Sequence, residues 1–415
     1  MAATARPNLA GHVAFTYPAF AHYISARFFM VAALEMQSVA VGWQVYEITK
    51  KPLDLGLVGL AQFLPGILLF LVSGHAADRF DRKNVLVVTY CGFALCSSLL
   101  LEYSMRGTRS IALIYAIMVL VGIVRAFSGP SSRAILPQLV SEVHFPNAVA
   151  WNSSIFQTST ILGPALGGFI YAISHGPSAV YGTAVAAAGV AILLMMRVKT
   201  MRKPYAPEPI SVKTVLAGLE YIWRQKLILG SISLDLFAVL LGGAVALLPV
   251  YAGEILRTGP WGLGLLRSSP GIGAAAMALL LAYRPLKRRA GATMLFCVAG
   301  FGLSTILFGL SRNLELSMLA LLLVGATDMV SVVVRGTLVQ LATPDEMRGR
   351  VTAVEMIFIG ASNEFGQFES GITASWFGTV AAVVLGGVGS LLVTAIWAWR
   401  FPELRKVDKL TRTGN

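Results

Sequence analysis

Apolar segments of about 20 residues recur along almost the whole chain, and this repetition restricts the fold more than any other feature. A helix of about 20 residues spans the hydrocarbon core of a bilayer. Twelve such segments occur, at 22–47, 55–77, 84–104, 110–134, 147–174, 178–197, 228–253, 261–283, 291–311, 315–340, 351–375 and 378–399. The sequence therefore predicts an all-α membrane protein with twelve transmembrane helices.

The composition excludes the main soluble classes of protein. Hydrophobic residues make up 56% of the 415 residues and charged residues 13%, which is about half the charged share of a soluble domain. An intrinsically disordered chain needs the opposite balance, and a disulfide-rich scaffold needs more than three cysteines. The net charge of +13 alone would suggest a nucleic-acid partner, but the position of the charges gives a better explanation.

Lysine and arginine are distributed unevenly between the two sides of the predicted membrane. With both termini inside, the inner stretches hold 23 of the 33 Lys and Arg residues. The outer loops hold six, namely Lys50, Lys51, Arg106, Arg109, Arg257 and Arg312. Because short cytoplasmic loops are rich in Lys and Arg, we expect an inner-membrane protein with both termini cytoplasmic. This bias explains the basic charge without nucleic acid.

A long charged linker divides the predicted spans into two groups of six. It occupies 199–227 and contains the proline-rich run KTMRKPYAPEP. Its second part places apolar residues at helical spacing, which predicts an amphipathic helix at the membrane surface. The predicted units are thus an N-terminal six-helix half at 1–198, the linker, and a C-terminal half at 228–415.

The two halves carry similar sequences at equivalent positions. The run RAILPQLV from Arg133 matches RGTLVQLA from Arg335, 202 residues later. Each run lies at or near the end of the fourth span of its half, which indicates a duplication. Two pseudo-symmetric halves of six helices are an architecture of secondary transporters, in which the substrate site lies between the halves near the midplane.

The loop between the second and third spans has an unusual pattern of charge. It reads GHAADRFDRK, and orientation alone would not require its two aspartates. This loop resembles the loop signature of the major facilitator superfamily, although the superfamily often has glycine in place of Asp81. The resemblance implies that Asp78 faces the start of span eleven and latches the cytoplasmic side shut. The predicted gating residues are Gly74, Asp78, Arg79, Asp81, Arg82 and Lys83.

Two further motifs agree with this resemblance. RAFSGP in span four, with Arg125, is similar to the arginine motif of the superfamily. LGPALGG in span five resembles the motif of its proton-coupled exporters, with Gly163, Pro164, Gly167 and Gly168. The resemblance covers nearly the whole chain, and runs such as VGWQVYEIT and FIGASNEFGQFESG are most similar to the branch that contains the enterobactin exporter.

Polar side chains within the predicted spans are the candidate coupling and substrate residues, because such groups are costly in lipid and usually face a cavity. They are Arg27, Glu35, Gln37, Arg125, Asp235, Asp328, Arg335, Asn363, Glu364 and Glu369. A carboxylate in a poorly hydrated cavity can load and release a proton near neutral pH. The alternative is internal pairing, for example of Asp328 or Glu369 with Arg335, which fixes packing or closes a gate.

The function expected from these patterns is proton-coupled efflux of a small amphipathic organic molecule, a drug or a siderophore-like compound, by alternating access. An importer or uniporter of a polar solute and a lipid carrier or flippase are the alternatives. A polytopic membrane enzyme is disfavoured, because no clustered catalytic set is visible. The expected partners are the substrate, protons and the bilayer, with the proton gradient as driving force, no cofactor or metal, and a monomeric state.

Overall fold

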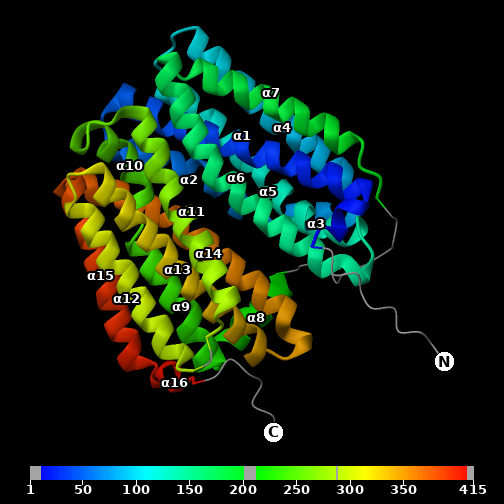
Figure 1. Ribbon diagram of the computed structural model, residues 1–415, viewed down its shortest axis with the longest axis vertical. Helices are drawn as coiled ribbons and strands as arrows, with labels where there is room; N and C mark the ends of the chain where they lie inside the picture. Colours follow the sequence, from blue (N-terminus) through cyan, green and yellow to red (C-terminus); the bar gives the residue numbers. More distant parts are fainter. Residues whose placement is uncertain (1–10, 201–211, 287, 409–415) are drawn as a thin grey trace.

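The computed structural model describes residues 11–200, 212–286 and 288–408, except for the side chains at 70–71, 75, 77–78, 212–214 and 345. In these ranges the chain is a bundle of helices and contains no strand (Figure 1). The all-α prediction is therefore confirmed. The predicted gating side chain of Asp78 lies outside the described part, so its latch stays a prediction.

The helices of the first group are α1 (Pro18–Thr49), α2 (Pro52–Leu68), α3 (Phe70–Arg79), α4 (Arg82–Met105), α5 (Ile111–Ala134), α6 (Phe145–Ser174) and α7 (Ser178–Met196). The linker contributes α8 (Val212–Arg224). The second group comprises α9 (Lys226–Leu241), α10 (Leu248–Val250), α11 (Gly259–Tyr283), α12 (Ala290–Leu310), α13 (Leu314–Ala342), α14 (Asp345–Phe377), α15 (Thr379–Arg400) and α16 (Pro402–Lys406). Short 3-10 turns, among them Ala244–Leu247, and a π-helical turn at Tyr251–Ile255 complete the described elements.

Nine helices in the described ranges are long and apolar enough to cross a membrane, with 226–255 taken as one. Helix α2 has 17 residues, which is at the short end of what a span needs. Helices α6 and α14 are long enough, with 30 and 33 residues, but carry more polar side chains. The chain is a multi-pass membrane protein, and the count of twelve spans stays a prediction.

Two of the predicted spans are interrupted rather than continuous. The segment predicted at 55–77 divides at Leu69 into α2 and α3. The amide of Leu69 still donates to the carbonyl of Pro65 at 2.9 Å, so the division is a local departure from α-helical geometry. The segment predicted at 228–253 leaves the α-helical conformation at Gly242. Glycine weakens a helix interior by about 1 kcal/mol, and a second glycine follows directly, so the helix ends there.

The helix packing repeats between the two groups. Helix α1 packs against α6 and α7, as α9 packs against α14 and α15. Helix α2 packs against α5, as α11 packs against α13. Helix α4 lies against α5 and α7, as α12 lies against α13 and α15. Two copies of one six-helix unit would give this arrangement, and we refer to the groups α1–α7 and α9–α15 as the two halves.

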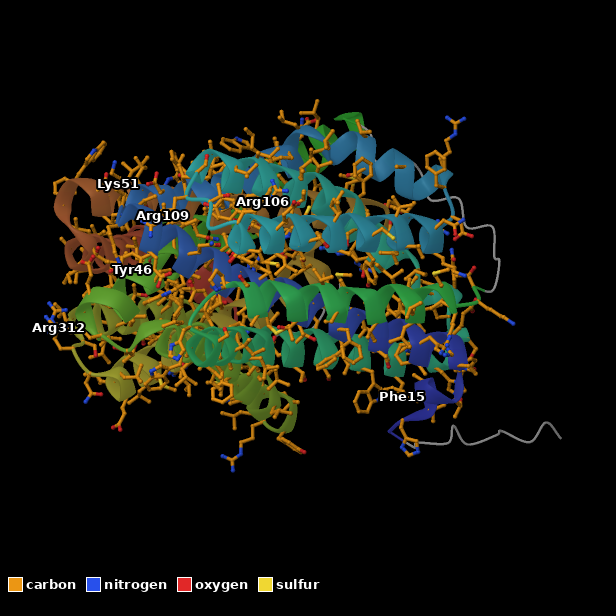
Figure 2. The ribbon with its side chains drawn as sticks, turned by 90° about the horizontal axis from the view of Figure 1, so that it is seen from above. Phe15, Tyr46, Lys51, Arg106, Arg109 and Arg312 are labelled. Atoms are coloured by element: carbon orange, nitrogen blue, oxygen red, sulfur yellow. The ribbon has the colours of Figure 1, made fainter. Side chains whose placement is uncertain are left out.

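The two halves meet along two seams, α6 with α11 and α2 with α14. The halves are together near α2, α10 and α11, and they diverge toward α3 and α8 (Figure 1). Lys51, Arg109 and Arg312 of the predicted outer loops lie at one end of the molecule, opposite Phe15 (Figure 2). The seams therefore lie toward the predicted outer end, and the separation is on the predicted cytoplasmic side.

Candidate functional site

The glycines of the LGPALGG motif let α6 pack closely against α1. A Cβ atom on Gly163 would lie 2.5 Å from the Cβ of Glu35, and one on Gly167 would lie 2.8 Å from the Cα of Met36. Both distances are shorter than side chains tolerate, so only glycine allows this approach. The motif thus places the backbone of α6 directly against the part of α1 that carries Glu35.

The third glycine of the motif, Gly168, faces the other half. A Cβ atom there would lie 2.9 Å from the Cα of Gly264 on α11. Two hydrogen bonds continue this seam: Ser268 Oγ donates to the carbonyl of Ile161 at 2.7 Å, and Gln157 Nε2 donates to the carbonyl of Gly271 at 2.9 Å. Helix α6 is therefore held between α1 of its own half and α11 of the other.

The second seam uses the same device between α2 and α14. A Cβ atom on Gly56 would lie 3.1 Å from the Cα of Phe368, and one on Gly371 would lie 3.2 Å from the Cα of Gly56. The rings of Phe63 and Phe365 meet edge to face, with centroids 5.4 Å apart. Small residues allow close helix contact in a bilayer, where packing rather than water drives association.

Polar contacts close the predicted outer end between the two halves. The hydroxyl of Tyr46 on α1 donates to the carboxylate of Glu254 at 3.0 Å, and Tyr46 lies at the same end as Lys51 (Figure 2). On the opposite side of the seams, Arg133 contacts the sulfur of Met356. The halves are thus joined at the predicted outer end and again, through Arg133 and Met356, on the side where the ribbons diverge.

Four charged side chains from both halves form a network between the seams. Arg125 on α5 lies 3.7 Å from the carboxylate of Glu364 on α14. Arg267 on α11 donates to the hydroxyl of Ser38 on α1 at 2.7 Å and interacts electrostatically with Glu35 and Glu364. Glu35 also interacts with Arg125. We call Glu35, Arg125, Arg267 and Glu364 the inter-half network.

Each half contributes one carboxylate and one guanidinium to the inter-half network, so its four formal charges cancel. The side chain of Arg125 is 64% exposed, whereas that of Glu364 is 16% exposed. Arg125 is therefore the accessible member of this pair, and Glu364 is the buried one. Glu35, Arg125 and Glu364 are among the candidates predicted from the sequence, whereas Arg267 is not. Its position within the apolar segment 261–283 was the available signal.

A second charged cluster lies inside the C-terminal half. Arg335 is 3% exposed and pairs with Asp235 on α9 at 3.3 Å and with Glu355 on α14 at 2.8 Å. Asp328 lies on α13, seven residues before Arg335 and on the same helix face. It interacts electrostatically with Asp235 and Arg335. The internal pairing considered as an alternative thus occurs at Arg335, but with Asp235 and Glu355 as its ion-pair partners. Glu369, also considered as a partner, lies elsewhere.

The remaining candidates in the N-terminal half have neutral partners. Arg27 donates to the hydroxyls of Ser132 at 2.5 Å and Tyr23 at 3.2 Å, and it lies over the ring of Phe156. Gln37 is buried and accepts a hydrogen bond from the hydroxyl of Ser97 at 2.5 Å. On α14, Asn363 is exposed and donates to the carbonyl of Ile359.

The predicted gating loop has a clear local role in ending α3 and starting α4. Asp81 is the N-cap of α4, and its carboxylate accepts a hydrogen bond from the amide of Lys83 at 2.9 Å. The ammonium of Lys83 donates to the carbonyl of Met196 at the end of α7. Gly74 is buried, Arg79 is exposed and Arg82 is half-buried. The departure from glycine at position 81 is therefore explained by helix capping.

The family model described as "Transmembrane secretion effector" matches residues 11–413. The chain belongs to this family, which is a family of the major facilitator superfamily. The enterobactin exporter EntS of Shigella boydii serotype 4 is 27% identical over 399 residues, which cover 94% of each chain. Proteins of the same name from Escherichia coli, such as that of strain SE11, have the same identity and coverage.

Solved structures support the same fold for this secretion-effector family member. A D-xylose-proton symporter covers 96% of the chain with a TM-score of 0.71 and 13% identity. A bacterial homologue of the human lysosomal transporter Spinster, in an inward-facing and occupied conformation, covers 93% with a TM-score of 0.73 and 12% identity. The aligned parts make up 100% and 97% of those chains. The family match and the curated relatives of equal coverage show that the chain is a transporter, and they confirm the expectation that it is not an enzyme.

The α6–α11 seam of this transporter predicts a strong effect of Gly168→Leu. The new side chain would push α6 away from Gly264, so we expect the outer end to open and transport to fall at least about tenfold. A cysteine at Ala165, in a background without native cysteines, reports the opening through labelling by a membrane-impermeant maleimide. Gly182→Leu on α7 is the matched control, because a Cβ there meets nothing within 4 Å. Unchanged labelling and transport in Gly168→Leu would contradict this role of the seam.

Proposed function

We propose that this transporter exports a small amphipathic organic molecule from the cytoplasm in exchange for protons. It would work by alternating access as a monomer in the inner membrane, with both termini cytoplasmic. The observation that supports this best is the inter-half network, because a titratable carboxylate on α1 interacts there with a guanidinium on α11 of the other half. A proton bound to that carboxylate changes a contact between the two parts that must move.

The charge of the inter-half network links proton binding to the relative position of the halves. With both carboxylates ionised, the two negative and two positive groups attract one another across the interface. A proton on Glu35 leaves a net positive charge and weakens its attraction to Arg267. Since a ligand shifts a conformational equilibrium by its difference in affinity between the states, a proton on Glu35 favours the state in which this attraction is absent.

Exchange also requires that proton and substrate exclude each other. A substrate group that donates hydrogen bonds to Glu35 or Glu364 stabilises the ionised carboxylate, and a protonated carboxylate offers that group a weaker acceptor. This exclusion is reciprocal. The factor by which a bound proton lowers the affinity for substrate equals the factor by which bound substrate lowers the affinity for the proton. Release of substrate on the more acidic outer side follows directly from this competition.

The direction of transport and the kind of substrate are proposed from the relatives. The matched family carries secretion in its description, and relatives of 27% identity are named as exporters of enterobactin. The solved structures support the fold alone, and one of them is named as a proton symporter. A siderophore-like molecule is thus the first substrate to test, and lipophilic drugs are the second.

The decisive experiment measures proton movement in proteoliposomes with a pH-sensitive dye while candidate substrates are added. We expect siderophores such as enterobactin, or lipophilic dyes, to drive protons out of the compartment in which the substrate accumulates. Substrate movement without proton movement would refute proton coupling and support a uniporter or lipid carrier. Proton movement in the same direction as the substrate would instead indicate a symporting importer.

A further inference from the structure

Two arginines of the N-terminal half lie close together and have no carboxylate partner. Arg27 on α1 donates to the hydroxyl of Ser132 at 2.5 Å, and Ser132 directly precedes Arg133 on α5. The charges of Arg27 and Arg133 interact with each other. Within the described ranges, neither side chain forms an ion pair with an aspartate or a glutamate. We call Arg27 and Arg133 the arginine pair.

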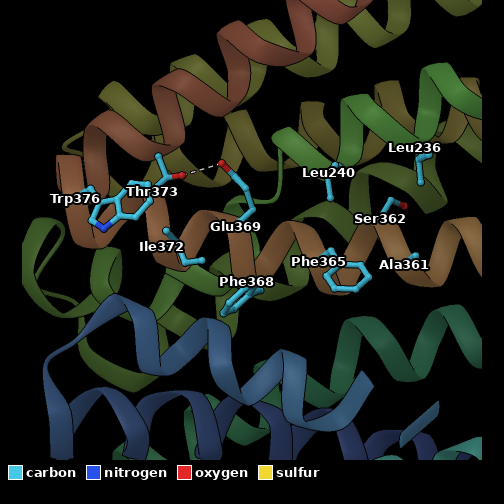
Figure 3. A pocket seen from close by; sticks show the side chains of 10 residues that line it. All are labelled: Leu236, Leu240, Ala361, Ser362, Phe365, Phe368, Glu369, Ile372, Thr373 and Trp376. Carbon is cyan, nitrogen blue, oxygen red and sulfur yellow. Dashed lines mark hydrogen bonds between the residues drawn. The ribbon is translucent and has the colours of Figure 1, made fainter. Parts of the chain in front are cut away.

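The facing helix of the other half does not neutralise the arginine pair. Helix α14 touches the pair through the sulfur of Met356, and it carries three carboxylates in its interior. Glu355 and Glu364 form ion pairs with other arginines. Glu369 lines a cavity between α9 and α14, where its carboxylate accepts a hydrogen bond from Thr373 at 2.8 Å (Figure 3). The arginine pair therefore holds two positive charges without a counter-ion in the part of the chain that the structure describes.

The arginine pair borders the region between the halves, on the predicted cytoplasmic side of the inter-half network. Arg27 lies nine residues after α1 begins at Pro18, about 14 Å along the helix axis, and Glu35 lies about 12 Å further. Arg27 and Ser38 are 11 residues apart, close to three helical turns, and thus lie on the same face of α1. Ser38 contacts Arg267 of the other half. A molecule that moves from the predicted cytoplasmic end to the network therefore passes the arginine pair.

The surroundings of Arg27 lack a negatively charged acceptor. Two of its hydrogen bonds go to the neutral hydroxyls of Tyr23 and Ser132, and its Nε–H is enclosed without a hydrogen-bond partner in the described ranges. An enclosed donor without an acceptor is unfavourable, and so are two like charges close together in a poorly hydrated place. A guanidinium presents its N–H groups in a planar fork that matches a carboxylate, sulfonate or phosphate. An oxyanion would therefore supply both the acceptor and the counter-charge.

We propose that the arginine pair binds the oxyanion of the exported molecule when that molecule enters from the cytoplasm. The ring of Phe156, which lies against Arg27 and is 43% exposed, provides an apolar contact beside the anion. The substrate class is then an amphipathic organic anion, with a carboxylate, sulfonate or phosphate next to an aromatic or aliphatic body. The assignment rests on the proposed export, and a neutral or cationic molecule gains no stabilisation from the pair.

The test compares an anion with a neutral molecule of the same shape. Equilibrium binding of pyrenebutyrate and of its amide is measured with the purified protein in phosphatidylcholine nanodiscs, without an ion gradient and with empty nanodiscs subtracted. We expect the wild type to bind pyrenebutyrate saturably and at least about tenfold more tightly than the amide, since only the anion pairs with the guanidinium groups. R27Q should remove this preference and leave the affinity for the amide unchanged. Arg109→Gln, which removes an exposed arginine at the outer end (Figure 2), should bind both molecules as the wild type does.

R133Q keeps the test decisive if R27Q is poorly folded, because the side chain of Arg133 is exposed. It should lower the affinity for pyrenebutyrate several-fold and leave the affinity for the amide unchanged. The proposal would be overturned by absence of saturable pyrenebutyrate binding to the wild type, or by equal affinity of the wild type for the anion and the amide. Retention of the preference in folded R27Q and R133Q would also overturn it. So would an equal loss of both affinities, because the arginines would then act only on the structure.

An anionic lipid headgroup carries the same chemistry, and nanodiscs that contain phosphatidylglycerol separate it from a soluble anion. Surface repulsion in these nanodiscs weakens anion binding to the wild type and to R27Q alike, so the ratio of their affinities should persist. Loss of this ratio would show that the lipid occupies the arginine pair, and it would overturn the proposal.

The anion site and proton-coupled export fail separately in these measurements. Absence of proton movement in proteoliposomes, with the preference for the anion retained, would refute proton exchange and leave the site intact. Loss of the preference, with proton-coupled export intact, would refute the site alone.

Discussion

Replacing Arg335 with methionine should destabilise the protein more than any other single substitution in the described spans. Arg335 is 3% exposed and is the ion-pair partner of both Asp235 and Glu355. Methionine has a similar length but leaves these carboxylates without a cation at a buried site. Removal of one partner of a buried ion pair costs about 3–5 kcal/mol. We expect a large drop in the melting temperature and in the amount of protein recovered from membranes.

The matched control for Arg335→Met neutralises the cluster as a whole. The triple variant Arg335→Met, Asp235→Asn and Glu355→Gln removes the three charges together, and it should recover most of the lost stability. Thermal unfolding in detergent, followed by tryptophan fluorescence or by loss of monodisperse protein, measures both variants. A single variant as stable as the wild type would show that the carboxylates have another partner or are already neutral.

The pairing of Arg335 illustrates what the sequence could and could not provide. Its place in an apolar span predicts that it is paired or faces a cavity, because an isolated charge in lipid is costly. The partners, however, come from α9 and α14, and helical spacing within one segment relates only residues of that segment. The sequence pattern therefore fits pairing of Arg335 with Glu369 as well as it fits the observed pairing with Asp235 and Glu355.

The sequence predicts that the glycine motif of span five forms a close helix contact. It does not predict which helices the two faces of the motif meet. The sequence indicates that α6 approaches another helix closely. The structure places Gly163 against α1 and Gly168 against α11 of the other half. A helix face is fixed by the 3.6-residue period, yet which neighbour it meets depends on the arrangement of the whole bundle. The same reason explains why Arg267 escaped selection as a partner of Glu35.

Hydropathy also could not predict the helix breaks or the surroundings of each carboxylate. A window of about 20 residues averages over Gly242, so the predicted span 228–253 reads as continuous although α9 ends at Leu241. Glu369 looked equivalent to Glu364 as a carboxylate in an apolar segment. Five residues separate them, so Glu364 lies toward Arg125 whereas Glu369 lines the cavity between α9 and α14. Only the packing of neighbouring helices separates these environments.

Replacing Glu35 with glutamine should abolish proton movement driven by substrate, while the protein still folds and binds substrate. Glutamine keeps the size of the side chain and can accept a hydrogen bond from Arg267, but it does not titrate. The α1 position of the inter-half network then has one fixed charge state, so a proton bound there can no longer bias the halves. In the pH-dye assay we expect the signal to fall to that of protein-free liposomes.

The same variant should retain exchange of labelled for unlabelled substrate across the membrane, because exchange requires movement of the halves but no net proton transfer. Glu47→Gln is the matched control: it makes the same chemical change just over three turns further along α1, where Glu47 accepts hydrogen bonds from Trp43 and Tyr171. That variant should keep proton coupling. Proton movement that persists in Glu35→Gln and disappears in Glu364→Gln would transfer the coupling role to the carboxylate of α14. Loss of exchange together with proton movement would instead make Glu35 a residue that holds the two halves in register, since a residue that only carries the proton leaves exchange intact.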